Sequence, residues 1–332
     1  ALSKKDQQRK IGDLILNNAM YIIIAIAIIF ITVKQPKFIS LSSIVNIISL
    51  TAAKLPIALG IGGCIVLTGT DISAGRVVGL AACISASLLT TVFKVFPNMT
   101  SAMPIPVVLL IVLGVGAAVG FVNGFSVAKF KLHPFIVTLS TQLITYGIIL
   151  MYLMNGVNNG QTLSGLTDSY RSLITGTLFT IGGVAIPRYV LYAVILTAVM
   201  WVIWNKTTFG KNMFAVGVSG VNVARTIILV FMLAGVMYGI TGFFDGARIA
   251  SANANTGLNY ECDAIAACVI GGVSFVGGIG RISGIVVGVL LLQIIFAGLN
   301  FLSVDPNMLY IIKGLIILVA CAIDMRKYLV RK

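Results

Sequence analysis

Residues 21–33 read Y-I-I-I-A-I-A-I-I-F-I-T-V, an apolar run without a charged side chain. Apolar runs near the roughly 20 residues that cross a bilayer recur along the chain. In hydrocarbon, only helices and closed barrels satisfy the backbone hydrogen bonds. Barrel strands alternate apolar and polar residues over short segments, whereas this run is continuous. The sequence therefore predicts an all-α membrane protein that crosses the bilayer many times.

Composition supports this fold class. Of the 332 residues, 58% are hydrophobic and only 10% are charged, and the mean hydropathy is +1.06. A soluble domain is about 25% charged. The net charge of +14 would suggest nucleic acid as the partner of a soluble chain, but basic residues collect in the cytoplasmic loops of membrane proteins. We therefore expect membrane lipid and no nucleic acid around this chain.

The apolar runs predict about ten transmembrane helices. They cover residues 19–33, 44–68, 75–93, 104–127, 134–154, 188–205, 226–246, 262–276, 282–299 and 307–324. Basic residues at both chain ends and in alternate loops predict that both ends are cytoplasmic. The expected organisation is then a cytoplasmic N-terminal extension (1–18), a transmembrane domain (19–325) with an external loop (155–187) and a cytoplasmic loop (205–225), and a cytoplasmic tail (326–332).

Small residues recur at every fourth position in several helices: Gly75 and Gly79, Gly116, Gly120 and Gly124, Gly235 and Gly239, and Gly284 and Gly288. This spacing lets helix backbones approach closely. Lys54 and Pro56 fall within a long apolar run and suggest an interrupted helix, a frequent feature of transport sites.

Two segments of the chain resemble each other. Residues 61–79 and 270–288 align without a gap and share eight residues: five glycines, two valines and one isoleucine. Chance matching in a chain rich in glycine and valine is one explanation, and an internal structural repeat is the other. The charge-based topology makes the two segments parallel, whereas one miscounted helix would make them inverted.

The cysteines and the acidic residues are the side chains that could carry chemistry. The five cysteines show no metal-ligand spacing, so we expect buried thiols and no metal site. No acid falls at the centre of a predicted helix, which argues against an ion-driven transporter. Asp71, with Ser73, either caps the following helix or lines a translocation route, and Arg76 can neutralise it. Glu261 and Asp263 begin a helix, where they favour its dipole, pair with Arg248 or dock an external partner.

Four motifs carry a resemblance: L-T-G-T-D-I-S-A-G-R-V-V-G-L-A-A (67–82), F-G-K-N-M-F-A-V-G (209–217), S-G-V-N-V (219–223) and the segment 260–280. They resemble bacterial ATP-binding-cassette (ABC) importer permeases for monosaccharides, the galactose/methyl-galactoside permeases more than the ribose permeases. The resemblance implies a permease in the bacterial inner membrane that pairs with a second copy, a cytoplasmic ATPase subunit and an external sugar-binding protein. ATP and Mg²⁺ then belong to the ATPase subunit, because the chain has no G-x-x-x-x-G-K-[ST] loop and needs no cofactor.

The resemblance also assigns a coupling loop that contacts the ATPase. Its residues here are Lys211, Asn212, Gly217, Ser219, Gly220 and Asn222. About seven residues of the family pattern have no counterpart between Gly217 and Val218. Either this protein has lost most of its coupling helix, or residues are absent from the sequence as printed, and we favour the second because the matches resume on both sides.

The substrate route requires weak sugar affinity, since a site that binds tightly cannot release. We expect polar side chains inside or at the ends of helices to line it: Asp71, Ser73, Asn123, Gln142, Gln293 and Asn300. Each of them can instead join neighbouring helices by a hydrogen bond. The expected substrate is galactose, methyl galactoside or glucose. The alternatives are a ribose, pentose or nucleoside ABC permease, an ion-coupled secondary transporter and a membrane-embedded enzyme.

Overall fold

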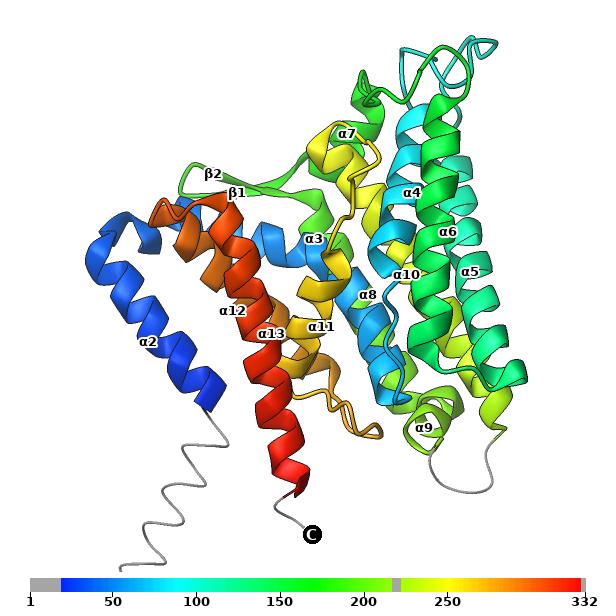
Figure 1. The fold of residues 1–332 in the computed structure, drawn as a ribbon. Coiled ribbons are helices and arrows are strands. Elements are labelled where there is room, and N and C mark those ends of the chain that lie inside the picture. The colour runs from blue at the N-terminus through cyan, green and yellow to red at the C-terminus, as the bar shows by residue number, and fades with distance from the viewer. Residues whose placement is uncertain (1–18, 217–221, 330–332) are drawn as a thin grey trace, which may run out of the picture.

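The computed structural model describes residues 19–216 and 222–329. Each of the ten stretches predicted to be helical contains an α-helix, and together they form one bundle (Figure 1). These helices are α2 (Ala19–Lys34), α3 (Leu41–Val66), α4 (Ala74–Leu88), α5 (Ile105–Phe130), α6 (Pro134–Met154), α8 (Arg188–Lys206), α10 (Val223–Ile249), α11 (Tyr260–Ile270), α12 (Ile282–Phe301) and α13 (Pro306–Leu329).

Shorter elements connect the long helices. They are the 3-10 helix η1 (Pro36–Ile39), the helices α7 (Asp168–Thr175) and α9 (Thr208–Phe214), and the strands β1 (Thr177–Ile181) and β2 (Val184–Pro187). The two strands form an antiparallel hairpin inside the predicted external loop. This hairpin is a small β element in a chain predicted to be all-α.

Within the described residues, six helices are long and apolar enough to cross a membrane: α3, α5, α6, α8, α10 and α12. The protein is therefore a polytopic, mostly helical membrane protein. The N-terminal end of α2, α9 and the C-terminal end of α13 lie on one side of the bundle (Figure 1). α7, the hairpin and the rest of residues 155–187 lie on the opposite side.

Two predicted helices are shorter than expected. α4 ends at Leu88 rather than at 93, and α11 ends at Ile270 rather than at 276. At about 1.5 Å per residue, α4 is about 22 Å long and α11 about 16 Å, less than the roughly 30 Å of a bilayer core. The non-helical segments 67–73 and 250–259 precede these helices. They cross the part of the bundle that the short helices do not reach (Figure 1). Both helices are thus half-helices that begin inside the bundle.

The central helix α3 runs through Pro56 without a break. The interruption predicted at Lys54 and Pro56 is therefore wrong. Ile57, Ala58 and Leu59 directly after the proline are completely buried, so neighbouring helices surround α3 where the proline removes a backbone hydrogen bond. Proline is tolerated inside a membrane helix under these conditions.

The predicted close approach of helix backbones is confirmed. A methyl group added to Gly116 of α5 would collide with the carbonyl oxygen of Gly235 of α10, and one added to Gly284 of α12 would collide with that of Gly271. Lipid tails provide no hydrophobic push between helices, so such contacts depend on small residues. α5 and α10 form one of the tightest helix pairs of the bundle.

The two similar segments each lead from the end of one helix through a non-helical stretch into the next helix, but the second segment includes only the last residue of its first helix, Ile270. Residues 61–79 cover the end of α3 and the start of α4, and residues 270–288 cover the end of α11 and the start of α12. α3 and α11 both descend in Figure 1, and α4 and α12 both ascend. The two segments therefore run parallel, as the charge pattern indicated.

Candidate functional site

A chain of polar side chains joins the turn before α4 to α5 and α6. Asp71 Oδ1 accepts hydrogen bonds from the backbone N–H of Ser73 at 3.0 Å and from its hydroxyl at 2.6 Å. Asn123 Nδ2 donates to Ser73 Oγ at 3.0 Å. Thr141 Oγ1 completes the chain by donating to Asn123 Oδ1 at 2.6 Å. Asp71, Ser73 and Asn123 are completely buried.

This arrangement confirms one part of the expected turn and overturns two others. Asp71 satisfies a free amide at the start of α4, as predicted. Ser73 occupies the N-cap position, but its side chain does not cap the helix. Arg76 does not pair with Asp71: it donates to the carbonyl oxygen of Ala254 at 2.9 Å, and its guanidinium carbon lies 4.2 Å from the centroid of the Tyr146 ring. The burial of the polar chain indicates that it holds the turn in place.

A second cluster carries charge. Lys313 of α13 lies 2.9 Å from Asp263 of α11, and Arg248 lies 2.9 Å from Asp245, both on α10. The Lys54 ammonium of α3 lies over the ring of Tyr260, 2.6 Å from its centroid. Ionisable residues inside the membrane are rare, pair with one another and mark transport routes. This cluster joins four helices around the start of α11.

Glu261 lies where the two half-helices meet. A methyl group at Gly75, in the first turn of α4, would collide with Glu261 Oε2 and with the carbonyl oxygen of Gly257. Glu261 belongs to the first turn of α11, so its carboxylate lies close to the N-termini of both helices. Helix N-termini stabilise negative charge. Pairs of broken helices whose ends meet inside the bundle are typical of transporter substrate sites.

Comparison with known proteins identifies the family. The family model described as "Branched-chain amino acid transport system / permease component" matches residues 43–321. The chain belongs to this permease family. No solved structure matches the permease significantly.

Relatives that cover nearly the whole chain include permeases named for sugar import. This permease is 42% identical to the galactose/methyl galactoside import permease MglC of Haemophilus influenzae, over 98% of this chain and 99% of that protein. It is 43% identical to MglC of Salmonella typhimurium, over 94% of this chain and 95% of that protein. The ribose import permease RbsC of H. influenzae is 33% identical, over 95% of each chain. The resemblance to monosaccharide permeases is confirmed, with the galactose members more similar than the ribose members.

The acids predicted to dock a binding protein are inside the permease. Glu261 is 4% exposed and Asp263 is 9% exposed. Arg248, a predicted partner of these acids, pairs with Asp245 instead, so that predicted ion pair is wrong. Docking by Glu261 and Asp263 stays a prediction, and it would first require their exposure.

The remaining predicted route residues do not gather at one place. Gln142 is half-buried on α6, one turn before Tyr146, whereas Gln293 is buried within α12. Asn300 is exposed near the C-terminal end of α12. The permease thus places Gln142 close to the Arg76 contact and leaves the other two elsewhere on the bundle.

The sequence reasoning missed Asp245, Lys54 and Lys313 as members of the charged cluster. Asp245 is completely buried and lies in the C-terminal part of α10, so the statement that no acid falls at the centre of a predicted helix left this buried acid out. The signal was the pair Asp245 and Arg248, three residues apart inside an apolar run, because intramembrane charges pair within reach of each other.

The predicted coupling loop is partly described. Lys211 and Asn212 are exposed on α9, which Thr207 caps by accepting from the N–H of Gly210 at 3.2 Å. Asn222 caps α10 by accepting from the N–H of Arg225 at 3.2 Å. Gly217, Ser219 and Gly220 lie outside the described residues.

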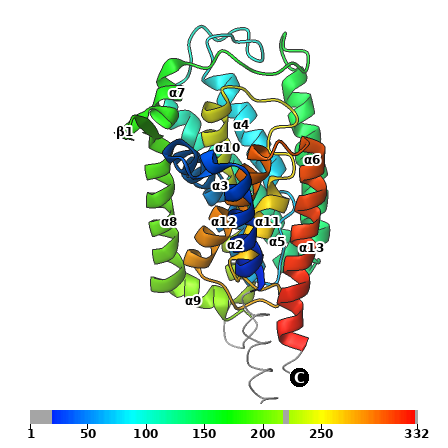
Figure 2. The ribbon, with the colours of Figure 1, turned by 90° about the vertical axis from the view of Figure 1, so that its left-hand side faces the viewer.

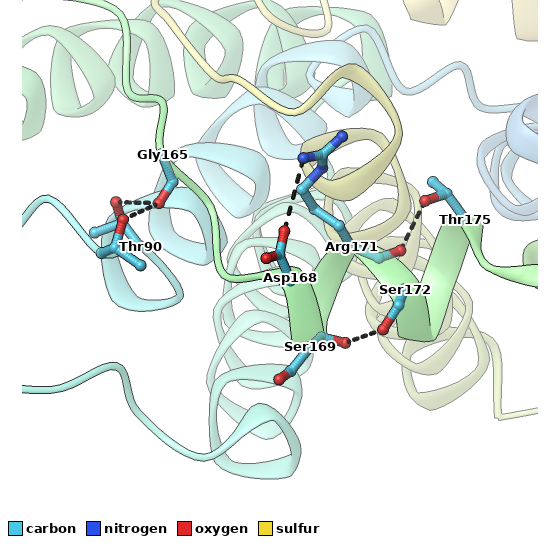
Figure 3. Close-up of polar contacts among 8 residues, drawn as sticks. Thr90, Gly165, Asp168, Ser169, Arg171, Ser172 and Thr175 are labelled. Carbon is cyan, nitrogen blue, oxygen red and sulfur yellow. Dashed lines mark hydrogen bonds and ion pairs between the residues drawn. The ribbon is translucent and has the colours of Figure 1, made fainter.

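On the opposite side, hydrogen bonds hold α7 against α10 and the segment before α7 against the end of α4. Thr90 Oγ1 lies 3.0 Å from the carbonyl oxygen of Gly165 (Figure 3). The buried phenol of Tyr170 donates to the carbonyl oxygen of Phe243 at 2.5 Å, and burial raises the pKa of Tyr170, so the proton stays in place. Asp168 and Arg171 form an exposed 3.9 Å ion pair on the outer face of α7. This side therefore exposes the Asp168–Arg171 pair of α7 together with apolar side chains of the hairpin, Phe179 and Ile181 among them.

Proposed function

We propose that this chain is the membrane-spanning subunit of an ABC importer that carries galactose or methyl galactoside across the bacterial inner membrane. The observation that carries the proposal is the charged cluster around the start of the half-helix α11, inside a chain of this permease family. The galactose permeases named above, similar over nearly their whole length, support the substrate.

The proposed route runs along a surface we call the charged face: Arg76, Tyr146, Tyr260, Asp263 and Lys313. In Figure 1, α4 and α11 lie between α6 and α13, and Figure 2 shows α6 and α13 at the same side of the bundle with α4 and α11 further in. Four of these five side chains are partly exposed. Hydroxyl groups of a sugar can hydrogen-bond the charged groups, while tyrosine rings offer apolar contact. A second copy packed against this face would enclose the route, and Gln142 would then lie at its edge.

In this proposal all ten helices take part in crossing the membrane, and the side that carries α9 is cytoplasmic. Residues 1–18 and 326–332 are then cytoplasmic, and the exposed α9 residues Lys211 and Asn212 face the ATPase subunit, which holds ATP and Mg²⁺. The opposite side, with α7 and the hairpin, receives the sugar-binding protein. The chain itself hydrolyses nothing.

The test is uptake by reconstituted complexes. The tagged permease is purified from its host membranes with the proteins that accompany it, and reconstituted into vesicles. We expect uptake of labelled galactose that requires both ATP and the binding protein. Ribose supplied in parallel is the matched control, and transport of ribose alone would establish the ribose alternative.

Energy coupling is tested in the same vesicles. Uptake should continue when an ionophore removes ion gradients and should stop when ATP is withheld. Uptake that needs an ion gradient and no ATP would contradict the importer and favour the secondary transporter.

A further inference from the structure

A groove of about 590 Å³ runs between α3, α8 and α12, and α8 lies across the bundle from α6 and α13 of the charged face (Figure 2). α8 and α12 form its sides, and Ala52 and Leu55 of α3, both about 5% exposed, form its floor. Val194 and Trp201 on the α8 side are 60% and 46% exposed. The groove therefore opens outward, toward the position of lipid in a membrane protein.

The shape and chemistry of the groove fit a hydrocarbon chain. Its α8 wall extends from Val190 to Trp201, which at about 1.5 Å per residue is about 16 Å. This length is close to half of the roughly 30 Å bilayer core, the depth of one lipid leaflet. The walls are almost entirely apolar, with Thr51, Thr197 and Ser283 as the hydroxyl-bearing exceptions. A sugar would find few hydrogen-bond partners there.

Two cations flank one end of the groove. Lys206 Nζ lies 5.5 Å from the centroid of the Trp201 ring, and Arg281 directly precedes Ile282, which lines the groove. Both cations are exposed. Among the described residues, no carboxylate lies within ion-pair distance of either one. Their charge is therefore not neutralised by the described part of the protein.

A second cavity continues from the same end. It has a volume of about 650 Å³ and is lined by Arg281, by Phe214 of α9 and by glycines of the segment 271–280. Ser283 lines both cavities, so they adjoin at the start of α12. An apolar groove thus ends in a more polar space beside two cations.

We propose that this composite site binds an anionic phospholipid, with an acyl chain in the groove and the phosphate between Lys206 and Arg281. Basic pockets between transmembrane helices bind anionic head groups. A second copy of the chain fits the site less well, because four of the nine acids, Asp71, Asp245, Glu261 and Asp263, are buried in each copy and cannot reach these cations.

The head-group part of the site is tested by native mass spectrometry of the purified chain with phosphatidylglycerol and phosphatidylcholine at equal concentrations. We expect the wild type to retain phosphatidylglycerol preferentially. Each cation near a membrane surface favours an anionic lipid by about fivefold, so Lys206→Gln with Arg281→Gln should reduce that preference roughly 25-fold. Lys129→Gln removes an exposed cation at the end of α5 and should leave the preference unchanged. Equal retention of both lipids by the wild type would overturn the proposal.

The acyl-chain part is tested with two neighbouring residues of α8. Ala198→Trp places a large ring in the groove and should displace the bound lipid, whereas Val199→Trp, an exposed position outside the groove lining, should not. A photo-reactive benzoylphenylalanine in place of Trp201, a lining residue that is already aromatic, then identifies the occupant in native membranes without narrowing the groove at Ala198. Cross-linking to phospholipid supports the proposal, and cross-linking to a second copy or to another protein overturns it.

Discussion

Lys313 Nζ of α13 lies 2.9 Å from Asp263 Oδ1 of α11, and their side chains are 23% and 12% exposed. The ammonium group also lies 4.6 Å from the centroid of the Phe296 ring of α12. One lysine therefore connects the C-terminal helix to the first turn of a half-helix and to a neighbouring helix. Because the contact lies among apolar helices, each charge depends on the other for compensation.

Removing one member of this pair should destabilise the protein more than removing both. Lys313→Met leaves Asp263 charged and largely buried, which costs roughly 3 kcal/mol. The double variant Lys313→Met with Asp263→Leu removes both charges and should regain most of the lost stability. The measurement is thermal unfolding of the purified chain in detergent. A single variant as stable as the wild type would show that water or lipid head groups already compensate these charges.

Two glycines of α5, Gly116 and Gly114, provide a matched test of helix packing. Gly116→Ala forces a methyl group against the carbonyl oxygen of Gly235, so α5 and α10 must separate. Gly114→Ala places the same methyl group where nothing lies within 4 Å. We expect Gly116→Ala to lower the yield of folded protein and the melting temperature, and Gly114→Ala to change neither. Equal behaviour of the two variants in size-exclusion and thermal assays would argue against this packing.

Much of the fold could be predicted because membrane helices are long apolar runs. The sequence predicted α6 as residues 134–154, the bounds found in the structure, because Pro134 begins the helix and a polar segment follows it. The ends of α4 and α11 could not be predicted in this way. Residues 89–93 and 271–276 remain apolar or small. The contact of Thr90 with Gly165 takes the first segment out of the helix, whereas Gly272, with a φ of 82°, ends α11 in the left-handed conformation that favours glycine.

The candidate site was less accessible to sequence reasoning. Asp71 and Ser73 are two residues apart, so their hydrogen bond follows from local geometry. Lys313 and Asp263 are 50 residues apart, and no spacing rule joins residues on separate helices. The prediction that Arg76 neutralises Asp71 was wrong for the same reason, because the Tyr146 ring that receives the guanidinium comes from another helix.

Two substitutions of Asp71, in the turn before α4, separate the effect of its charge from its role as a hydrogen-bond acceptor. Asp71→Asn keeps Oδ1, which accepts from Ser73, whereas Asp71→Ala removes it. If the role of Asp71 is structural, the Asp71→Asn variant should keep nearly the stability of the wild type, whereas Asp71→Ala should lose roughly 1 kcal/mol of unfolding free energy. Folded yield and melting temperature give the measurement, with uptake measured in parallel. Loss of uptake in a normally folded Asp71→Asn variant would instead assign this carboxylate to the sugar route.

The exposed residues of α9 test contact with the ATPase. Lys211→Glu reverses a charge on the proposed cytoplasmic contact and should lower the sugar-stimulated ATPase activity of the reconstituted complex. Membrane insertion should not change, because the side chain is exposed. Lys129→Glu, an equally exposed reversal at the end of α5, is the control and should leave the stimulation intact. Stimulation that survives Lys211→Glu would place the coupling contact away from α9.

The ring of Tyr146 tests the charged face. The Arg76 guanidinium lies over this ring, an attraction worth roughly 0.5–2 kcal/mol that a phenylalanine ring preserves and an alanine loses. If Arg76 and Tyr146 line the sugar route, Tyr146→Phe should retain most uptake, and Tyr146→Ala should reduce it several-fold because Arg76 loses its fixed position. Leu143 of α6 is 66% exposed, so Leu143→Ala is the control and should change neither uptake nor stability. Folded yield is measured together with uptake. Normal uptake by a well-folded Tyr146→Ala variant would remove this face from the route. Reduced uptake at an unchanged folded yield would confirm that the ring holds Arg76 where sugar passes.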